Sequence, residues 1–193
     1  MQNYLSKDMV CIILSGGKSS RMKRDKSLLP FMNSNSLAQY QYERLKPFFK
    51  KVYISSKENK FDFIDNEDLI IDDNNIYSPI VALKTVFSKI QDKKLFIITV
   101  DTPLVSINSI NKLIENSIKY EVTIAKTQKV HNLCGIFSTI LLEKIDNMLK
   151  NDIHKVGYLI KNSNFNIVNF NSDEEFINLN FYDEYKKALT IIS

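Results

Sequence analysis

Short apolar runs alternate with amphipathic helical stretches along the whole 193-residue chain. The runs are rich in Val, Ile and Phe with few polar interruptions, which is typical of strands covered on both faces. Apolar residues spaced three or four apart within 37–48, 107–118 and 141–149 predict helices. This alternation predicts an α/β fold in which a mostly parallel sheet lies between helices. The predicted strands are 9–14, 51–55, 69–72, 95–100, 121–125 and 166–170.

The length of the chain fits one domain whose core needs neither disulfides nor a metal. Cys11 and Cys134 lie far apart in apolar surroundings, which predicts buried, reduced thiols. No apolar run is long enough to cross a bilayer, and the N-terminus lacks the apolar region of a signal peptide, so we expect a cytoplasmic protein without a membrane partner. The net charge of +4 is modest and concentrated near the N-terminus, which favours a small anionic ligand over nucleic acid.

The chain contains only four glycines, and two of them, Gly16 and Gly17, follow the first predicted strand. In open α/β sheets, ligands bind outside the carboxyl ends of the strands. Consecutive glycines let amide N–H groups turn toward a phosphate, because no Cβ blocks its approach. Arg21 and Lys26 follow closely and can neutralise phosphoryl oxygens. The segment therefore predicts phosphate binding rather than a plain turn. The patterns GxxxxGK[ST] and GxGxxG are absent, which argues against a P-loop kinase and a dinucleotide dehydrogenase.

Two later segments carry candidate metal or phosphate ligands. Asp101 follows the fourth predicted strand and precedes Thr102-Pro103, a position where a nucleotide enzyme holds Mg²⁺, although a plain turn acid fits as well. Asn178 and Asn180 stand two residues apart. On an extended segment, that spacing places both side chains on one face. His154 is interpreted as a surface residue.

The segment 14–29, LSGGKSSRMKRDKSLL, resembles the signature of the molybdenum cofactor guanylyltransferase family, which typically reads L[AS]GGxSxRMGxDKxLL. The resemblance continues through DTP at 101–103, HNLCG at 131–135 and NxN at 178–180, and therefore covers nearly the full length. It implies a three-layer, Rossmann-like nucleotidyltransferase fold in a single domain. Residues up to about 105 are expected to bind the nucleotide, and the remainder is expected to bind the acceptor.

The resemblance implies Mg²⁺-dependent transfer of GMP from GTP to molybdopterin, with release of pyrophosphate. The attacking phosphate monoester is already ionised at neutral pH, so no general base is needed. Catalysis then depends on alignment and charge neutralisation. The expected catalytic residues are Arg21, Lys26 and Asp101, with Asp101 also holding Mg²⁺; the nucleotide-binding set is Leu14, Ser15, Gly16, Gly17, Lys26, Ser55, Asp72, Asp73 and Asp101; the acceptor-binding set is His131, Asn178 and Asn180. Which of the two neighbouring aspartates faces the nucleotide stays open.

The sequence departs from the family pattern at four places. Lys23 replaces the usual Gly after Arg-Met, and SPIVA at 78–82 stands where the family has GPLAG. Asn132 replaces a Pro, and Ser55 lies where a base-contacting Asn is often found. These departures leave the phosphate-transfer residues intact and affect the recognition of base and pterin.

Three alternative functions remain open: a cytidylyltransferase acting on the same pterin, a sugar-phosphate or isoprenoid nucleotidyltransferase, and a nucleotide-sensing protein without catalysis. Leu-Ser-Gly-Gly favours the guanylyl branch, because the cytidylyl branch tends to read Leu-Ala-Ala-Gly. Intact Arg21, Lys26 and Asp101 argue against a sensor. The expected partners beyond GTP and molybdopterin are an accessory GTP-binding protein and molybdoenzyme apoproteins or their chaperones.

Overall fold

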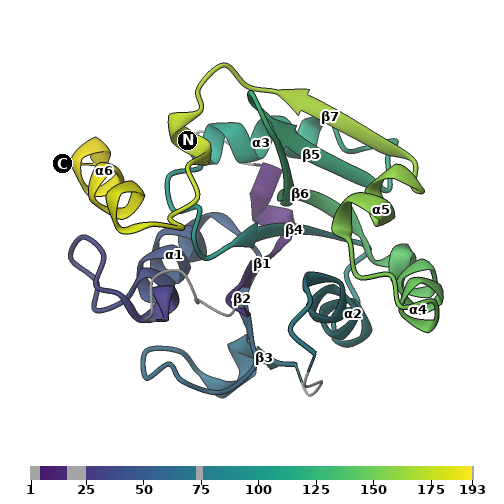
Figure 1. The fold of residues 1–193 in the computed structure, drawn as a ribbon, viewed down its shortest axis with the longest axis horizontal. Helices are drawn as coiled ribbons and strands as arrows, with labels where there is room; N and C mark the ends of the chain where they lie inside the picture. Colours follow the sequence, from purple (N-terminus) through teal and green to yellow (C-terminus); the bar gives the residue numbers. More distant parts are fainter. Residues whose placement is uncertain (1–4, 17–24, 73–75, 193) are drawn as a thin grey trace.

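The computed structural model describes residues 5–16, 25–72 and 76–192. In this part of the chain one seven-stranded sheet forms the middle layer, in the order β3-β2-β1-β4-β6-β5-β7. Helices α1, α3 and α6 lie on one face of the sheet and α2, α4 and α5 on the other (Figure 1). The predicted three-layer α/β fold is confirmed. The strands are β1 Val10–Leu14, β2 Lys51–Ser56, β3 Leu69–Ile71, β4 Lys94–Thr99, β5 Val122–Lys126, β6 Val130–Ser138 and β7 Phe165–Asn169.

The central strand β1 is buried along its whole length and pairs in parallel with β2 and β4. Its side chains alternate between the two faces of the sheet. Cys11 and Ile13 belong to the core beneath α1 and α3, whereas Val10, Ile12 and Leu14 belong to the core beneath α2 and α4. Because both faces are covered, the strand is apolar at every position, as its sequence indicated.

Strand β6 was not predicted, and it is the antiparallel member of the sheet. It pairs antiparallel with β4 and with β5, while the other printed pairings are parallel. Gly135 lies where β6 approaches β5 most closely: a Cβ there would stand 2.1 Å from the Thr123 carbonyl oxygen. The glycine of the HNLCG segment is thus required by strand packing.

Helices α1 and α3 begin with a side-chain cap, and α2 begins with a proline. Ser36 and Ser106 each accept a hydrogen bond from the amide three residues further on, and Pro79 is the first residue of α2. One predicted position is wrong: Ile118 is 80% exposed, because α3 ends at Glu115. The helices are α1 Leu37–Leu45, α2 Pro79–Lys89, α3 Ile107–Glu115, α4 Leu142–Lys150, α5 Val156–Lys161 and α6 Tyr182–Ile192, and the short 3₁₀ turns include η2 Lys26–Leu28, η4 Asn66–Asp68 and η6 Glu174–Phe176.

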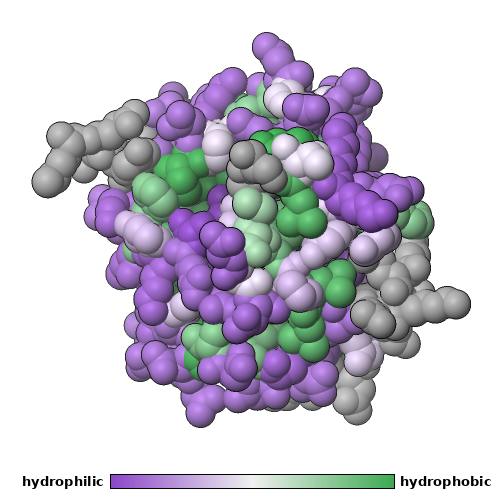
Figure 2. All heavy atoms as spheres, turned by 90° about the vertical axis from the view of Figure 1, so that its left-hand side faces the viewer, coloured by the Kyte–Doolittle hydropathy of each residue, from purple (hydrophilic) through white to green (hydrophobic). Residues whose placement is uncertain are grey.

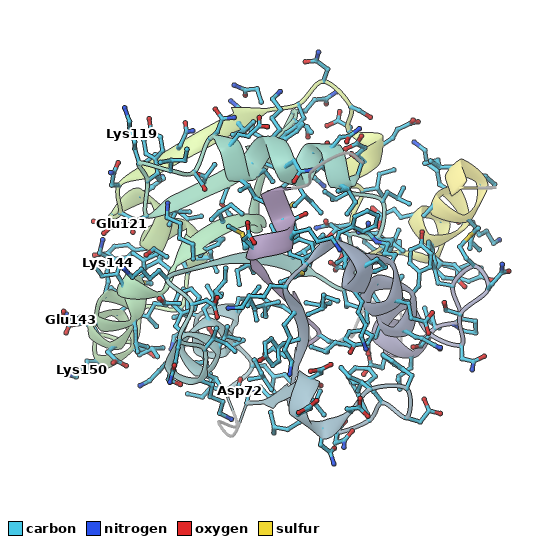
Figure 3. The ribbon with its side chains drawn as sticks, turned by 180° about the vertical axis from the view of Figure 1, so that it is seen from behind. Asp72, Lys119, Glu121, Glu143, Lys144 and Lys150 are labelled. Atoms are coloured by element: carbon cyan, nitrogen blue, oxygen red, sulfur yellow. The ribbon has the colours of Figure 1, made fainter. Side chains whose placement is uncertain are left out.

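The surface is largely polar on the side that carries α1 and α6. Figure 2 shows that apolar atoms appear there in patches between hydrophilic side chains. On the opposite side, Lys144 of α4 lies beside Glu121, 3.4 Å from its carboxylate (Figure 3). None of the helices described is long and apolar enough to span a membrane.

Candidate active site

Lys26, Asp101 and Asn180 meet at the carboxyl edge of the sheet. The Lys26 Nζ lies 3.0 Å from the Asp101 Oδ2 and 3.0 Å from the Asn180 Oδ1. The ion-paired side chains are each 17% exposed, so the pair is accessible but partly shielded from water. Lys26 begins the turn η2, Asp101 follows β4, and Asn180 lies just before α6. The structure therefore brings Lys26 and Asn180 together, although 154 positions separate them in the sequence.

The carboxylate of Asp101 is fixed by its own loop. Thr99, the last residue of β4, donates its hydroxyl to the Asp101 Oδ1 at 2.6 Å. The Thr102 hydroxyl and amide both donate to the Thr99 carbonyl. The Asp101 carbonyl accepts from the Leu179 amide at 2.8 Å, which ties the segment before α6 to this loop. The carboxylate thus points at Lys26 without help from a ligand.

A cavity of about 150 Å³ opens beside this pair. Leu14, Ser15 and Gly16 form one wall at the end of β1, and Pro79 and Ala82 of α2 contribute another. A Cβ placed on Gly16 would meet no atom of the described residues within 4 Å. The glycine is therefore not required by packing, and its open side faces space that a ligand can use.

Asp25 is a site residue that the sequence analysis did not select. It lines the cavity and caps η2, accepting from the Ser27 amide at 3.0 Å and the Ser27 hydroxyl at 2.7 Å. Its other oxygen pairs with Lys60, which lies in the segment after β2. Burial disfavours the carboxylate, but the hydrogen bonds and charge of Lys60, together with Ser27, hold the Asp25 pKa below its usual value. The Asp-x-Ser cap was visible in the sequence, whereas the Lys60 contact was not.

Ser55 and Asp72 lie further along the same edge and do not line this cavity. Ser55 is 2% exposed, and its carbonyl accepts from the Ser15 amide at 2.8 Å. Asp72 follows β3 (Figure 3) and is 4% exposed. Its two oxygens pair with the Lys57 Nζ at 2.6 Å and the Thr85 hydroxyl at 3.1 Å. Asp72 thus braces the loop after β3 against β2 and α2.

The predicted acceptor residues are only partly brought together. Asn180 joins the Lys26 pair. The segment 178–180 belongs to none of the strands of the described sheet, and the Asn180 amide donates to the Asn178 carbonyl at 2.8 Å, which closes a tight turn. That Asn178 shares a face with Asn180 stays a prediction. Gly17, Arg21 and Asp73 lie outside the described residues.

His131 is placed in the core rather than at the cavity. It is 7% exposed, its ring lies 4.9 Å from the Phe176 ring, and its Nε2 lies 3.0 Å from the Thr127 hydroxyl. Burial lowers the His131 pKa below its usual value, and the charge of Lys129 adds to this effect.

A second, wider cavity of about 650 Å³ adjoins the first and shares Pro79 and Leu133 with it. Its remaining wall is formed by Asn132 of β6 and by the residues before and within α5, and the sequence analysis selected none of these as site residues. His154, interpreted as a surface residue, has a side chain that is 30% exposed and lines this cavity. The α5 wall consists of His154, Lys155, Val156, Gly157, Tyr158 and Lys161.

Residues 11–163 match the family model described as a MobA-like NTP transferase domain. A molybdenum cofactor guanylyltransferase of Campylobacter jejuni is 38% identical over 93% of this chain and 95% of its own length. A molybdenum cofactor guanylyltransferase of Helicobacter pylori is 34% identical over 100% of this chain and 97% of its own length.

Solved structures agree with these sequence relationships. The molybdopterin-guanine dinucleotide biosynthesis protein A of Archaeoglobus fulgidus has a TM-score of 0.77 at 16% identity, covering 95% of this chain and 98% of that one. The bifunctional IspDF of Campylobacter jejuni has a TM-score of 0.75 at 22% identity, covering 94% of this chain and 54% of that one. At these identities the likeness concerns the fold. The family model and the curated relatives show that the chain belongs to the MobA-like nucleotidyltransferases, in the group of the molybdenum cofactor guanylyltransferases.

Proposed function

We propose that this nucleotidyltransferase joins GMP from GTP to molybdopterin in the cavity beside Asp101, with Mg²⁺ as the metal. The observation that carries the proposal is the convergence of Lys26, Asp101 and Asn180 at the open side of Gly16. A cation, a carboxylate and an amide oxygen at the carboxyl ends of parallel strands provide the groups that a nucleoside triphosphate and its metal need.

The oxygen atoms of this cluster fit Mg²⁺. Asp101 and Asn180 each direct an oxygen at the same cationic atom, Lys26 Nζ, so a point between them already favours positive charge. No group of three or more His, Cys, Asp or Glu residues suited to a metal occurs among the described residues. Mg²⁺ commonly binds through one or two protein oxygens and the substrate phosphates, which agrees with this sparse set. When bound, the ion would polarise the phosphoryl oxygens and neutralise charge on pyrophosphate.

The protein residues position and neutralise the triphosphate. Gly16 lets the phosphates approach the end of β1, because the space above its Cα is open. Lys26 supplies positive charge, which we expect to stabilise the departing pyrophosphate. Asp25 holds the turn from which Lys26 extends, through its hydrogen bonds to Ser27. Arg21 and Gly17 complete this set in the proposal, on the ground of the family resemblance.

The acceptor is proposed to bind in the wider cavity along α5. Lys155 and Lys161 add positive charge to its wall, which suits the phosphate of molybdopterin. Tyr158 is 45% exposed and offers an aromatic face to a flat ring system. Because this cavity shares Pro79 and Leu133 with the nucleotide cavity, both substrates can meet near Asp101. The attacking phosphate is ionised at neutral pH, so the site needs no general base.

Thermal stability measured with Mg²⁺ and each of GTP, ATP, CTP and UTP tests the nucleotide assignment. A ligand present at 100 times its Kd stabilises the folded state by about 2.7 kcal/mol, enough for a clear rise in Tm. We expect the largest rise with GTP and a smaller rise when Mg²⁺ is omitted. Equal Tm values with and without every nucleotide would contradict the proposal.

A further inference from the structure

Two polar side chains of α1, Gln41 and Arg44, bind the backbone of the loop that follows β4. The Gln41 side chain is fully buried, and its Nε2 donates to the Thr99 carbonyl at 3.3 Å and the Thr102 carbonyl at 3.1 Å. The Arg44 Nη1 donates to the Val105 carbonyl at 2.9 Å. One helix therefore binds three carbonyls between the end of β4 and the start of α3, those of Thr99, Thr102 and Val105.

The two side chains also orient each other. The Arg44 Nε donates to the Gln41 Oε1 at 2.6 Å. A guanidinium has only donors, so it can face only the oxygen of the Gln41 amide. The amide nitrogen of Gln41 must then point at the loop carbonyls. Arg44 thus sets the direction in which Gln41 donates.

An arginine at position 44 is energetically unfavourable if its role is only to fill space. Burial lowers its pKa to about 10, and among the described residues its Nη2 is buried without a hydrogen-bond partner. Glu174 and Glu175 line the same cavity as Arg44, but within the described residues neither carboxylate forms an ion pair with the guanidinium. A largely desolvated cation without a close ion-pair partner is unfavourable, and an apolar side chain of similar size would avoid that cost. The arrangement indicates a role beyond filling space between α1 and the sheet.

The loop that these two residues bind is the one that carries Asp101. The Thr99 hydroxyl orients the Asp101 carboxylate, and the Thr99 carbonyl is one of the acceptors of Gln41. We propose that Gln41 and Arg44 are positioning residues, forming a clamp that holds the Asp101 carboxylate in its place beside Lys26. The inference rests on the proposed function, in which Asp101 binds the metal. The side chains of the clamp bind backbone carbonyls of Thr99, Thr102 and Val105, so they act on the Asp101 carboxylate through the backbone of its loop.

The substitution Gln41→Glu separates positioning from stability. It keeps an acceptor for Arg44 and places a carboxylate next to the guanidinium, but it removes the donor to Thr99 and Thr102. We expect the fold to be kept and kcat to fall by about 10–100-fold, because small displacements of a reacting group have effects of this size. The KM for GTP should change less than about twofold, whereas the Mg²⁺ concentration for half-maximal rate should rise severalfold. Arg44→Met should show the same split between kcat and KM.

Tyr42→Phe is the matched control. Tyr42 lies on the same helix, is 4% exposed, and donates to the Asp68 carboxylate at 2.5 Å, away from the loop. We expect wild-type kcat and Mg²⁺ dependence in this variant even if its Tm falls. If all three variants lose activity only in proportion to their lost folded fraction, the clamp is overturned.

Hydrogen exchange separates failure of the clamp from failure of the proposed function. The Thr102 amide, bound to the Thr99 carbonyl, and the Leu179 amide, bound to the Asp101 carbonyl, report on the loop directly. In Gln41→Glu and Arg44→Met we expect both amides to exchange faster while the amides of β1 do not. Unchanged exchange of the loop overturns the inference whatever the enzyme's activity. Faster loop exchange in a protein that transfers no GMP would support the clamp and contradict the function.

Discussion

At the scale of single residues, Asp101 is the group on which the site depends most. Thr99 fixes one of its oxygens, and Lys26 meets the other. Both side chains are only 17% exposed, so the cost of removing their charges from water offsets much of the attraction between them. The pair therefore contributes little net stability to the fold, and we expect changes in it to appear mainly in the chemistry.

The substitution Asp101→Asn tests this expectation. Asn has the same shape and can still accept from the Thr99 hydroxyl, so the protein should fold normally. Removal of a metal-bound charge should cost several kcal/mol at the transition state, or about 10²–10³-fold in turnover. Asp92→Asn, which breaks a surface pair with Lys50, is the control and should keep full activity. A rate close to that of the wild type at saturating Mg²⁺ would rule out the metal assignment.

Gly135 and Gly16 allow a paired prediction, because packing requires a glycine at position 135 but not at position 16. Gly16→Val should leave Tm nearly unchanged and abolish GTP binding, since the added side chain enters open space beside the cavity. Gly135→Ala should destabilise the fold by about 1–3 kcal/mol, the usual cost of overpacking, because its Cβ would collide with the Thr123 carbonyl. Denaturation and calorimetric titration with GTP measure both effects. Unchanged GTP affinity in Gly16→Val would make the Gly pair a simple turn.

At the scale of elements, the 3₁₀ turn η2 owes its position to Asp25. The carboxylate caps the turn and pairs with Lys60, so the segment after β2 is joined to the residue before Lys26. This connection could not be inferred from the sequence, because it links residues 35 positions apart through tertiary packing.

The lowered pKa of Asp25 predicts how its contribution depends on pH. Its unfolded value is about 3.9. The contribution is fully present above that pH and is lost as the pH falls from 3.9 toward the lower folded pKa. The difference in unfolding free energy between the wild type and Asp25→Asn should therefore be constant near neutral pH and shrink in acid. Urea denaturation at a series of pH values measures it, and a difference that grows in acid would refute the assignment.

Helix α5 carries the prediction for the acceptor. Lys155→Gln and Tyr158→Ala should each raise the KM for molybdopterin severalfold, because they remove a charge or an aromatic face from the wider cavity. The KM for GTP should stay unchanged. Lys119→Gln, at an exposed position that does not line this cavity, is the control (Figure 3). An increased KM for GTP with an unchanged KM for molybdopterin would place the acceptor elsewhere.

At the scale of the whole molecule, the sequence predicted the fold class and six of the strands. Uninterrupted apolar runs such as β1 are reliable signals, because a strand covered on both faces has no polar side. Strand β6 was missed because its first half carries His131 and Asn132, which read as a motif rather than a strand. Its antiparallel insertion between β4 and β5 depends on pairings distant in sequence, which local patterns do not encode.

The sequence predicted only those site residues that belong to short motifs. Lys26 and Asp101 follow predicted strands, and Asn180 belongs to a short motif, so each could be selected individually. The clamp formed by Gln41 and Arg44 and the α5 wall of the wider cavity depend on which elements pack together, which local sequence patterns do not show. The helical spacing within 37–48 predicted a helix, but not that the Arg44 guanidinium binds the loop after β4.

The most direct test of the account is a competition for transfer. The purified protein is incubated with Mg²⁺, molybdopterin and equal concentrations of GTP and CTP, and the products are identified by mass spectrometry. We expect the guanine dinucleotide of the pterin as the main product, an equal amount of pyrophosphate, no product without Mg²⁺, and product formation slowed about 10²–10³-fold in Asp101→Asn. A cytosine dinucleotide as the main product, or no dinucleotide from either nucleotide, would contradict the account.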